Sequence, residues 1–439
     1  MFEIREKPEM VERAMLVSIY FDPSEVGEKQ AMLDELEDLV SNLGIGIAGK
    51  HLIKSRDMHA KFLCGTGKAQ EVKQLALDCR ADCVVFDNML SPSQQREWER
   101  LVDECVIDRE EVILDIFARR ARTREATLQV ELARMQYSLP RMARMWNHLD
   151  RQGGGSGGGK GGGGAARGEG EKQIEVDRRL ARARIEAIQR ELVLVTRQRA
   201  TQRKERERQA VATAAIVGYT NAGKSSLLSL VSGSEVMARD MLFATLDTTT
   251  RKIELPHGQP LLLTDTVGFI RNLPHRLVEA FKSTLEEAVL ADFLIQVVDA
   301  SDPEAVRHYE TTLEVLNELG AGDKPMIVVL TKVDLVPEER RGALETLLAP
   351  HFSGRVVPMS VKEGNGEGDL LNACVEMLES RVRRARFLIP YTRSDLVAAM
   401  HSEGKVFSTE YVEEGTLLEA VLPVSFYNTV SYTHLTLPT

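Results

Sequence analysis

The stretch with the strongest chemical signature runs from Gly218 to Ser225. It fits the pattern G-x-x-x-x-G-K-[ST] and follows directly on the apolar run Ala214–Val217, so we expect a strand that leads through a loop into a helix. Backbone N–H groups of such a loop surround an anion, a lysine reaches the outer phosphates, and a hydroxyl can ligate Mg²⁺. The alternative is an ordinary glycine turn before a helix. The predicted phosphate-loop residues are Gly218, Tyr219, Thr220, Asn221, Ala222, Gly223, Lys224 and Ser225.

A second predicted element follows the apolar run Leu261–Thr264 and reads Asp265-Thr266-Val267-Gly268. An acidic residue at a strand end can hold Mg²⁺ opposite Ser225, and the backbone N–H of Gly268 can turn toward a γ-phosphate. Thr266 and Val267 are expected to contact the nucleotide as well. Phe269 follows at a position where a side chain such as Gln could orient the attacking water, so we expect slow intrinsic hydrolysis, although the ring can equally well pack in the core.

Between these elements lies a hydroxyl-rich stretch, 243–250, without strong periodicity. A loop here can supply Thr245 as a further Mg²⁺ ligand only when the γ-phosphate is bound, which would make it a switch. We therefore predict Ser225, Thr245 and Asp265 as Mg²⁺ ligands, and Lys224, Thr245 and Gly268 as catalytic residues. Further predicted nucleotide contacts in the stretch are Phe243, Ala244, Leu246 and Asp247.

The nucleotide base is predicted from the element Thr331-Lys332-Val333-Asp334, which ends another apolar run. The carboxylate of Asp334 can accept hydrogen bonds from N1–H and the exocyclic amine of guanine, a donor pair that adenine lacks. The later element Ser360-Val361-Lys362 is expected to back the base through its main chain. Together these elements predict GTP as the substrate and Mg²⁺ as its cofactor.

The elements that must position these residues form an α/β domain over 211–385, with apolar strands that alternate with helices. Alternation over 1–116 predicts a second, small α/β domain with a parallel sheet. Residues 386–424 are expected to form a small α+β domain with a helix at Arg393–Ser402. The tail 425–439 is expected to be irregular and is assigned no role.

Between the two α/β domains, residues 117–210 are rich in arginine. Helical spacing predicts one long helix over Phe117–Leu149, kinked or divided at Pro140, and a second over Lys172–Gln209. The glycine tract 153–164 would form the tip of this antiparallel hairpin. A solvated face with i,i+4 ion pairs explains some of the arginines, but the excess favours contact with an RNA backbone.

Overall composition limits the remaining possibilities. The overall net charge of −10 does not predict a nucleic-acid partner. Only the local cluster of arginines in 117–210 supports such a partner. Five scattered cysteines include no C-x-x-C pair, which fits a reducing cytosol. The sequence has no apolar run of bilayer length, and we expect a cytoplasmic, monomeric protein without membrane insertion.

The chain also resembles the HflX family of ribosome-binding GTPases over nearly its whole length to about Pro423. The motifs that carry the resemblance are 86–88 with 91–95, 113–121 with 128–132, Asp177-Arg178-Arg179, the phosphate loop, 265–270 with 273–274, and 283–287. Three positions depart from the usual pattern. Thr331 replaces an Asn that helps to hold the base loop, Thr248 replaces Pro, and Glu169 lies in an altered Arg-Gly-Pro-Gly-Glu segment.

The resemblance implies an N-terminal region that docks on the large (50S) ribosomal subunit, with the hairpin tip directed toward 23S rRNA near the peptidyl-transferase centre. It also implies a GTPase that splits stalled ribosomes or assists late subunit assembly. Two alternatives stay open from the residues: an ATP- or GTP-driven enzyme that remodels rRNA, and a GTP-dependent protein switch with no RNA role.

Overall fold

The computed structural model describes two compact units of the chain, which are treated separately below. Unit 1 consists of Met1–Val193, Met241–Phe243 and Arg271–Phe281, and unit 2 of Leu194–Asp240, Ala244–Ile270 and Lys282–Thr439. The residues that the structure describes are 11–144, 175–195, 211–233, 243, 246, 248–256, 258–272, 282–348, 355–379, 382–423, 426–427 and 436–437.

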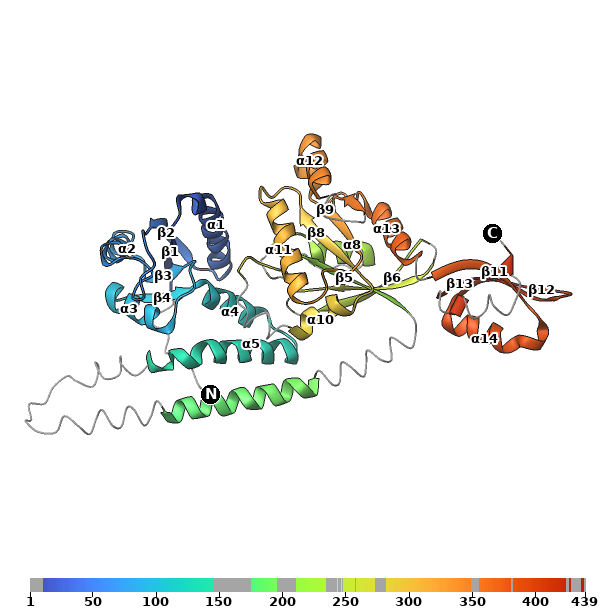
Figure 1. Cartoon of the computed structure of the whole chain (residues 1–439), viewed down its shortest axis with the longest axis horizontal. Coiled ribbons are helices and arrows are strands. Elements are labelled where there is room, and N and C mark those ends of the chain that lie inside the picture. Colours follow the sequence, from blue (N-terminus) through green and yellow to red (C-terminus); the bar gives the residue numbers. More distant parts are fainter. Residues whose placement is uncertain are drawn as a thin grey trace, which may run out of the picture. The chain divides into compact units, whose positions relative to one another are not determined.

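Unit 1 is built on a four-stranded parallel sheet in the order β2-β1-β3-β4 (Figure 1). The side chains of Met15, Val17 and Trp98 belong to the core that joins this sheet to the helices α2 and α3. The predicted small α/β domain with a parallel sheet is therefore confirmed. The bounds are β1 Arg13–Tyr20, β2 Gly46–Lys54, β3 Cys83–Phe86, β4 Cys105–Asp108, α2 Thr66–Asp78 and α3 Pro92–Val102.

Two further helices of unit 1, α1 (Val26–Asn42) and α4 (Arg109–Arg120), are joined by a buried polar cluster. The guanidinium of Arg109 donates to Asp87 at 3.0 Å, to the carboxylate of Glu35 and to the carbonyl of Met32. A buried cation needs such partners because desolvation would otherwise be costly. Arg109 therefore fixes α4 on α1 and on the end of β3.

The helical region after α4 differs from the prediction. One continuous helix over Phe117–Leu149 is wrong, because α4 already begins at Arg109, and α5 begins separately at Arg124 and ends at Ser138. The segment between α4 and α5 ends at Thr123. The hydroxyl of Thr123 caps α5 by accepting a hydrogen bond from the backbone N–H of Ala126. Pro140 then lies in the 3₁₀ helix Leu139–Arg144, in agreement with the predicted division there.

The second helix of the hairpin is described over 175–195. It packs on α5 through an apolar core of Leu128, Leu132 and Ile188. Arg124 pairs with Glu191 and Glu131 with Arg184, so increasing numbers on one helix meet decreasing numbers on the other. The hairpin is antiparallel, as predicted. Its expected tip at 153–164 lies outside the described residues.

Unit 2 contains a six-stranded sheet in the order β10-β9-β8-β5-β7-β6. All neighbours are parallel except β6, which runs antiparallel to β7 at the edge and was not expected. Its polar sequence exposes most side chains and buries Ile253, so it has no apolar run to detect. The bounds are β5 Ala212–Gly218, β6 Thr249–Glu254, β7 Pro260–Asp265, β8 Phe293–Asp299, β9 Met326–Thr331 and β10 Val356–Pro358.

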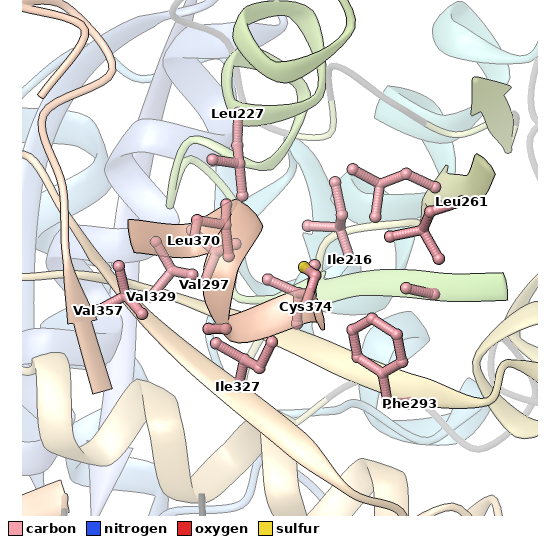
Figure 2. Packing of buried hydrophobic residues seen from close by; sticks show 14 of the residues in the cluster. Ile216, Leu227, Leu261, Phe293, Val297, Ile327, Val329, Val357, Leu370 and Cys374 are labelled. Carbon is pink, nitrogen blue, oxygen red and sulfur yellow. The ribbon is translucent and has the colours of Figure 1, made fainter. Parts of the chain in front are cut away.

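Helices cover both faces of this sheet. Figure 2 shows the core on one face, where Leu227, Leu370 and Cys374 meet strand residues such as Ile216 and Val297. On the other face α10, α11 and α12 pack over Ala215, Leu294 and Val298. The parallel strands are buried on both faces, which explains their continuous apolar runs. The bounds are α8 Lys224–Ser232, α10 Lys282–Leu290, α11 Ala305–Glu318, α12 Glu338–Leu348 and α13 Glu367–Glu379.

The remainder of unit 2 is a four-stranded antiparallel sheet, β12-β13-β11-β14, packed against α14 (Ser394–Glu403). It confirms the predicted small α+β region over 386–424. The expectation that the tail 425–439 is irregular is wrong at Thr436–Leu437, because this segment pairs with β11 as a fourth strand. The predicted domain boundary at 385 falls inside a strand, because α13 ends at Glu379 and β11 begins at Val382. The strands are β11 Val382–Ile389, β12 Lys405–Val412, β13 Gly415–Pro423 and β14 Thr436–Leu437. The helices of the described residues lack the length and apolar character that a bilayer-spanning segment requires.

Candidate functional site

The predicted phosphate loop lies between β5 and α8 and has the backbone geometry that the glycines require. Gly218 has a φ of +145°, and a Cβ there would lie 2.3 Å from the carbonyl oxygen of Val297. Gly223 has a φ of +93° and precedes the first residue of α8. Only glycine fits both positions without strain. The N-terminus of α8 is thus presented to the loop, as an anion-binding site needs.

Lys224 is buried inside this loop. Its ammonium donates to the carbonyl oxygen of Tyr219 at 2.7 Å. Burial lowers the pKa of Lys224 to about 8, and the negative charge of Asp265 opposes part of that effect. A lysine ammonium has three donors, so the bond to Tyr219 leaves others that can point to phosphate oxygens.

The predicted metal-binding residues Ser225 and Asp265 are in direct contact. The hydroxyl of Ser225 donates to Oδ2 of Asp265 at 2.6 Å, and Asp265 is buried at the end of β7. A hydroxyl and a carboxylate oxygen this close together are the hard donors that Mg²⁺ prefers. The residues present therefore fit Mg²⁺. The third predicted ligand, Thr245, lies outside the described residues, as do Ala244 and Asp247.

The segment after Asp265 is bound to the phosphate loop through its backbone. The N–H of Phe269 donates to the carbonyl of Gly218, and the N–H of Thr220 donates to the carbonyl of Phe269. Gly268 fits so closely that a Cβ would lie 2.9 Å from Cγ2 of Thr220 and 3.0 Å from Nζ of Lys224. The predicted γ-phosphate contact and the phosphate loop are thus brought together.

The side chain of Phe269 is buried in the core with Leu285 and Leu316. This is the packing role considered for the ring from the sequence. A phenyl group in that core cannot orient a water molecule at the phosphates. Thr266 is also used structurally, because its hydroxyl donates to the carbonyl of Ile216 at 2.7 Å. Val267 is buried beside it.

The predicted base loop begins at Thr331, at the end of β9. Its hydroxyl donates to the carbonyl of Ala222 in the phosphate loop at 2.7 Å and to that of Val298 at 3.2 Å. The sequence had suggested that Thr331 loses a contact that holds this loop. The structure shows that the hydroxyl itself joins the base loop to the phosphate loop.

The rest of the base loop is organised by two side-chain contacts. Lys332 pairs with Asp299 at 2.6 Å, and Oδ1 of Asp334 accepts from the hydroxyl of Ser360 at 2.7 Å. The backbone N–H of Val333 donates to the carbonyl of Met359 at 3.4 Å, so the loop and the segment after β10 are joined. Val361 and Lys362 continue the turn that Ser360 begins. The role of Asp299 was missed, because nothing in its local sequence indicates this partner.

Two predicted contacts before β6 are described and both are buried. The ring of Phe243 belongs to unit 1, where it packs edge-to-face on Phe117 with centroids 4.7 Å apart. Its side chain is thus part of the packing of unit 1, and its nucleotide contact stays a prediction. Leu246 is buried and also stays a prediction.

The hairpin of α5 and helix 175–195 was the predicted nucleic-acid interface. Six of its arginines, or those immediately before it, contact the protein itself. Arg141 is buried and donates to Gln95 and to the carbonyl of Leu90, while the ring of Tyr137 stacks beneath its guanidinium. The other five contact neighbouring helices or loops: Arg119, Arg120, Arg124, Arg134 and Arg184.

These contacts reduce the basic surface that the sequence suggested. On helix 175–195, Arg178, Arg179, Arg182 and Arg190 form no ion pair with another described residue, and Arg190 donates to the carbonyl of Glu186. Arg179, Arg182 and Arg190 are exposed. Positive charge held on one helix in this way can contact successive phosphates of a nucleic acid backbone. Arg197–Arg208, also predicted to contribute, lies outside the described residues.

Three family models match the chain. They are described as "GTP-binding GTPase N-terminal" for residues 30–118, "GTP-binding GTPase Middle Region" for 120–206 and "50S ribosome-binding GTPase" for 213–332. The proteins named GTPase HflX include one from Akkermansia muciniphila that is 99% identical over 428 residues, covering 98% of each chain. The GTPase HflX of Escherichia coli is 39% identical over 415 residues, covering 94% of each chain.

Among solved structures, a GTP-binding protein from Sulfolobus solfataricus in complex with GDP is 23% identical. The match covers 84% of this chain and 99% of that one, with a TM-score of 0.42.

Proposed function

The chain belongs to the HflX family of GTPases, and from this premise we propose that it binds the large ribosomal subunit through the hairpin. GTP binding and hydrolysis would be coupled to the splitting of stalled ribosomes or to late assembly of that subunit. The observation that carries the proposal is the separation of the hairpin arginines into two groups. One group is used in internal contacts, while Arg179, Arg182 and Arg190 remain exposed on helix 175–195.

The exposed arginines support rRNA as the partner because phosphate contacts need cations that can be desolvated without breaking the fold. Arg141 and Arg184 cannot serve, since each compensates an acidic or polar group of the protein. Among the described residues, Arg179 and Arg182 form no such contact, and Arg190 only donates to the carbonyl of Glu186 in its own helix. The predicted site is 23S rRNA near the peptidyl-transferase centre, and the protein would act in the cytoplasm as a monomer.

For the nucleotide site, we propose a role for each of the main predicted residues. Lys224 binds the outer phosphates, Asp334 accepts from the guanine base, and the N–H of Gly268 contacts the γ-phosphate. Ser225, Thr245 and Asp265 would hold Mg²⁺, which neutralises charge that develops on the phosphate oxygens during hydrolysis. Phe269 supplies no polar group, so hydrolysis in the absence of ribosomes is expected to be slow.

Co-sedimentation with purified 50S subunits tests the proposal. With a non-hydrolysable GTP analogue the wild-type protein should pellet with the subunits, and binding should weaken with GDP and with rising salt. The triple variant R179Q/R182Q/R190Q should bind more weakly and with a smaller salt dependence. The control K54Q/R56Q/R251Q removes as many positive charges from exposed positions outside the hairpin and should bind like the wild type.

Equal pelleting with GTP analogue, GDP and no nucleotide would count against nucleotide-controlled binding. Equal losses in the two triple variants would show that bulk charge, not the hairpin, drives association. Sucrose gradients of 70S ribosomes then separate splitting from assembly. Deletion within 153–164 should preserve GTP binding and slow the appearance of free subunits.

A further inference from the structure

An aromatic stack joins the phosphate loop to a residue outside the recognised nucleotide motifs. The ring of Tyr219 and the imidazole of His308 are stacked with centroids 3.7 Å apart and planes 9° apart. Tyr219 is the second residue of the phosphate loop, and His308 lies in the first turn of α11. Both belong to unit 2. The stack therefore connects the loop to a helix on one face of the sheet.

The imidazole of His308 is itself held in place. Its Nδ1 lies 3.6 Å from Oδ2 of Asp302, in the turn between β8 and α11. The other carboxylate oxygen of Asp302 accepts from the backbone N–H of Glu304 at 2.8 Å. Arg340 of α12 donates to the carbonyl of Asp302, which fixes the same turn. These contacts hold the imidazole of His308 in a fixed position against the ring of Tyr219.

The main-chain carbonyl of Tyr219 also contacts the ammonium of Lys224, the cation that we expect to bind the phosphates. This carbonyl accepts from Nζ of Lys224 at 2.7 Å. The residues before and after Tyr219 are both bonded to the backbone of Phe269. A shift of Tyr219 would therefore move the acceptor that orients the lysine ammonium and disturb the contact with the segment that follows Asp265.

We propose that His308 is a positioning residue for nucleotide binding, which acts by holding the ring of Tyr219 and thereby the carbonyl that orients Lys224. Its imidazole does not touch the nucleotide in this assignment. Stacked aromatic pairs contribute about 0.5–1.5 kcal/mol beyond their buried area, which corresponds to about two- to twelvefold in an equilibrium or rate constant. Loss of the stack should appear as faster nucleotide release.

The test is the dissociation rate of a fluorescent GDP from the full chain, without ribosomes. His308→Ala should release GDP about three to ten times faster than the wild type. His308→Phe keeps a flat ring against Tyr219 and should restore the rate to within about twofold. Tyr219→Ala should match His308→Ala, and the double variant should be no faster than either single variant, because both remove one interaction.

The matched control is Leu344→Ala on α12, which removes a buried side chain from the core beside α11 without touching the phosphate loop. It should lower the thermal midpoint and leave GDP release unchanged. The proposal is overturned if His308→Ala releases GDP at the wild-type rate or if His308→Phe fails to restore it. Additive effects in the double variant, or equal acceleration in Leu344→Ala, would overturn it as well.

Discussion

The hydroxyl of Thr331 donates to the carbonyl oxygen of Ala222 at 2.7 Å, although the two residues are 109 positions apart in sequence. This bond joins the loop that we assign to the base and the loop that we assign to the phosphates. In this assignment a guanine nucleotide contacts the base loop and the phosphate loop at once. Because the bond fixes the distance between the two loops, less conformational entropy is lost when the nucleotide binds. Thr331 can therefore hold the base loop in place of the more usual Asn.

Thr331→Val should accelerate GDP dissociation by about two- to twelvefold, the equivalent of one net hydrogen bond. Valine has nearly the same shape and removes only the hydroxyl, so the core around β9 should be little disturbed. Thr331→Ser keeps the donor and is the control. Stopped-flow release of a fluorescent GDP gives the rates, and identical rates for Val and Ser would contradict the role of the bond.

Lys224 should make nucleotide affinity fall in mildly alkaline solution. In the described structure burial lowers its pKa to about 8, and nearby phosphates would raise that pKa in the complex. Binding then takes up a proton above pH 8, so affinity should drop by about fourfold from pH 7 to pH 8.5. Below pH 7 this group is already protonated and contributes no pH dependence.

The control for that titration is Lys224→Arg, whose guanidinium stays charged over the same range. Its affinity should be lower overall and flat between pH 7 and 8.5. Equilibrium titration with fluorescent GDP measures both proteins. A wild-type curve as flat as that of the arginine variant would show that the ammonium is already stabilised before nucleotide arrives.

Asp334→Asn should exchange guanine preference for xanthine, because the amide replaces one acceptor of the carboxylate with an N–H donor that matches the oxygen xanthine carries in place of the exocyclic amine. Competition between GDP and XDP for the site measures the change. Ser360→Ala is the informative control, since it removes the donor that holds Asp334 but keeps the carboxylate. It should weaken GDP and leave the base preference unaltered. Unchanged competition in Asp334→Asn would exclude this residue as the base-reading group.

Arg141→Ala should destabilise unit 1 by about 3–5 kcal/mol, as expected when one partner of a buried charged network is removed. Burial raises the pKa of Asp108, and Arg141, 3.6 Å away, is one of the groups that oppose this shift. The exposed control Arg182→Ala should change stability by less than about 0.5 kcal/mol.

Urea unfolding in a Trp146→Phe background can follow this change, because Trp98 is then the single tryptophan and lies in the core of unit 1. Rates of binding to 50S subunits should rank the two variants the other way round. Arg182→Ala should affect ribosome binding and not stability. Similar unfolding midpoints for the two variants would contradict the division of the arginines into internal and exposed groups.

The local sequence predicted the nucleotide elements because each one directly follows an apolar strand. Gly218, Asp265 and Thr331 lie at the carboxyl ends of β5, β7 and β9, and neighbouring parallel strands bring such ends to one edge of the sheet. β6 escaped detection, since an edge strand with one buried side chain carries little apolar signal. The start of α4 at Arg109 and the helix break before Thr123 were likewise overlooked.

By itself, the sequence determined the order of the elements, the phosphate and base loops, and the fold class, since apolar periodicity and glycine positions act over a few residues. Tertiary structure alone decided which partners these residues meet. It buried Arg141 against Gln95, 46 positions away, and it joined Thr331 to Ala222 and Tyr219 to His308. The reason is physical: a side chain's type fixes what it can bond to, but only the packed chain brings a distant partner within reach.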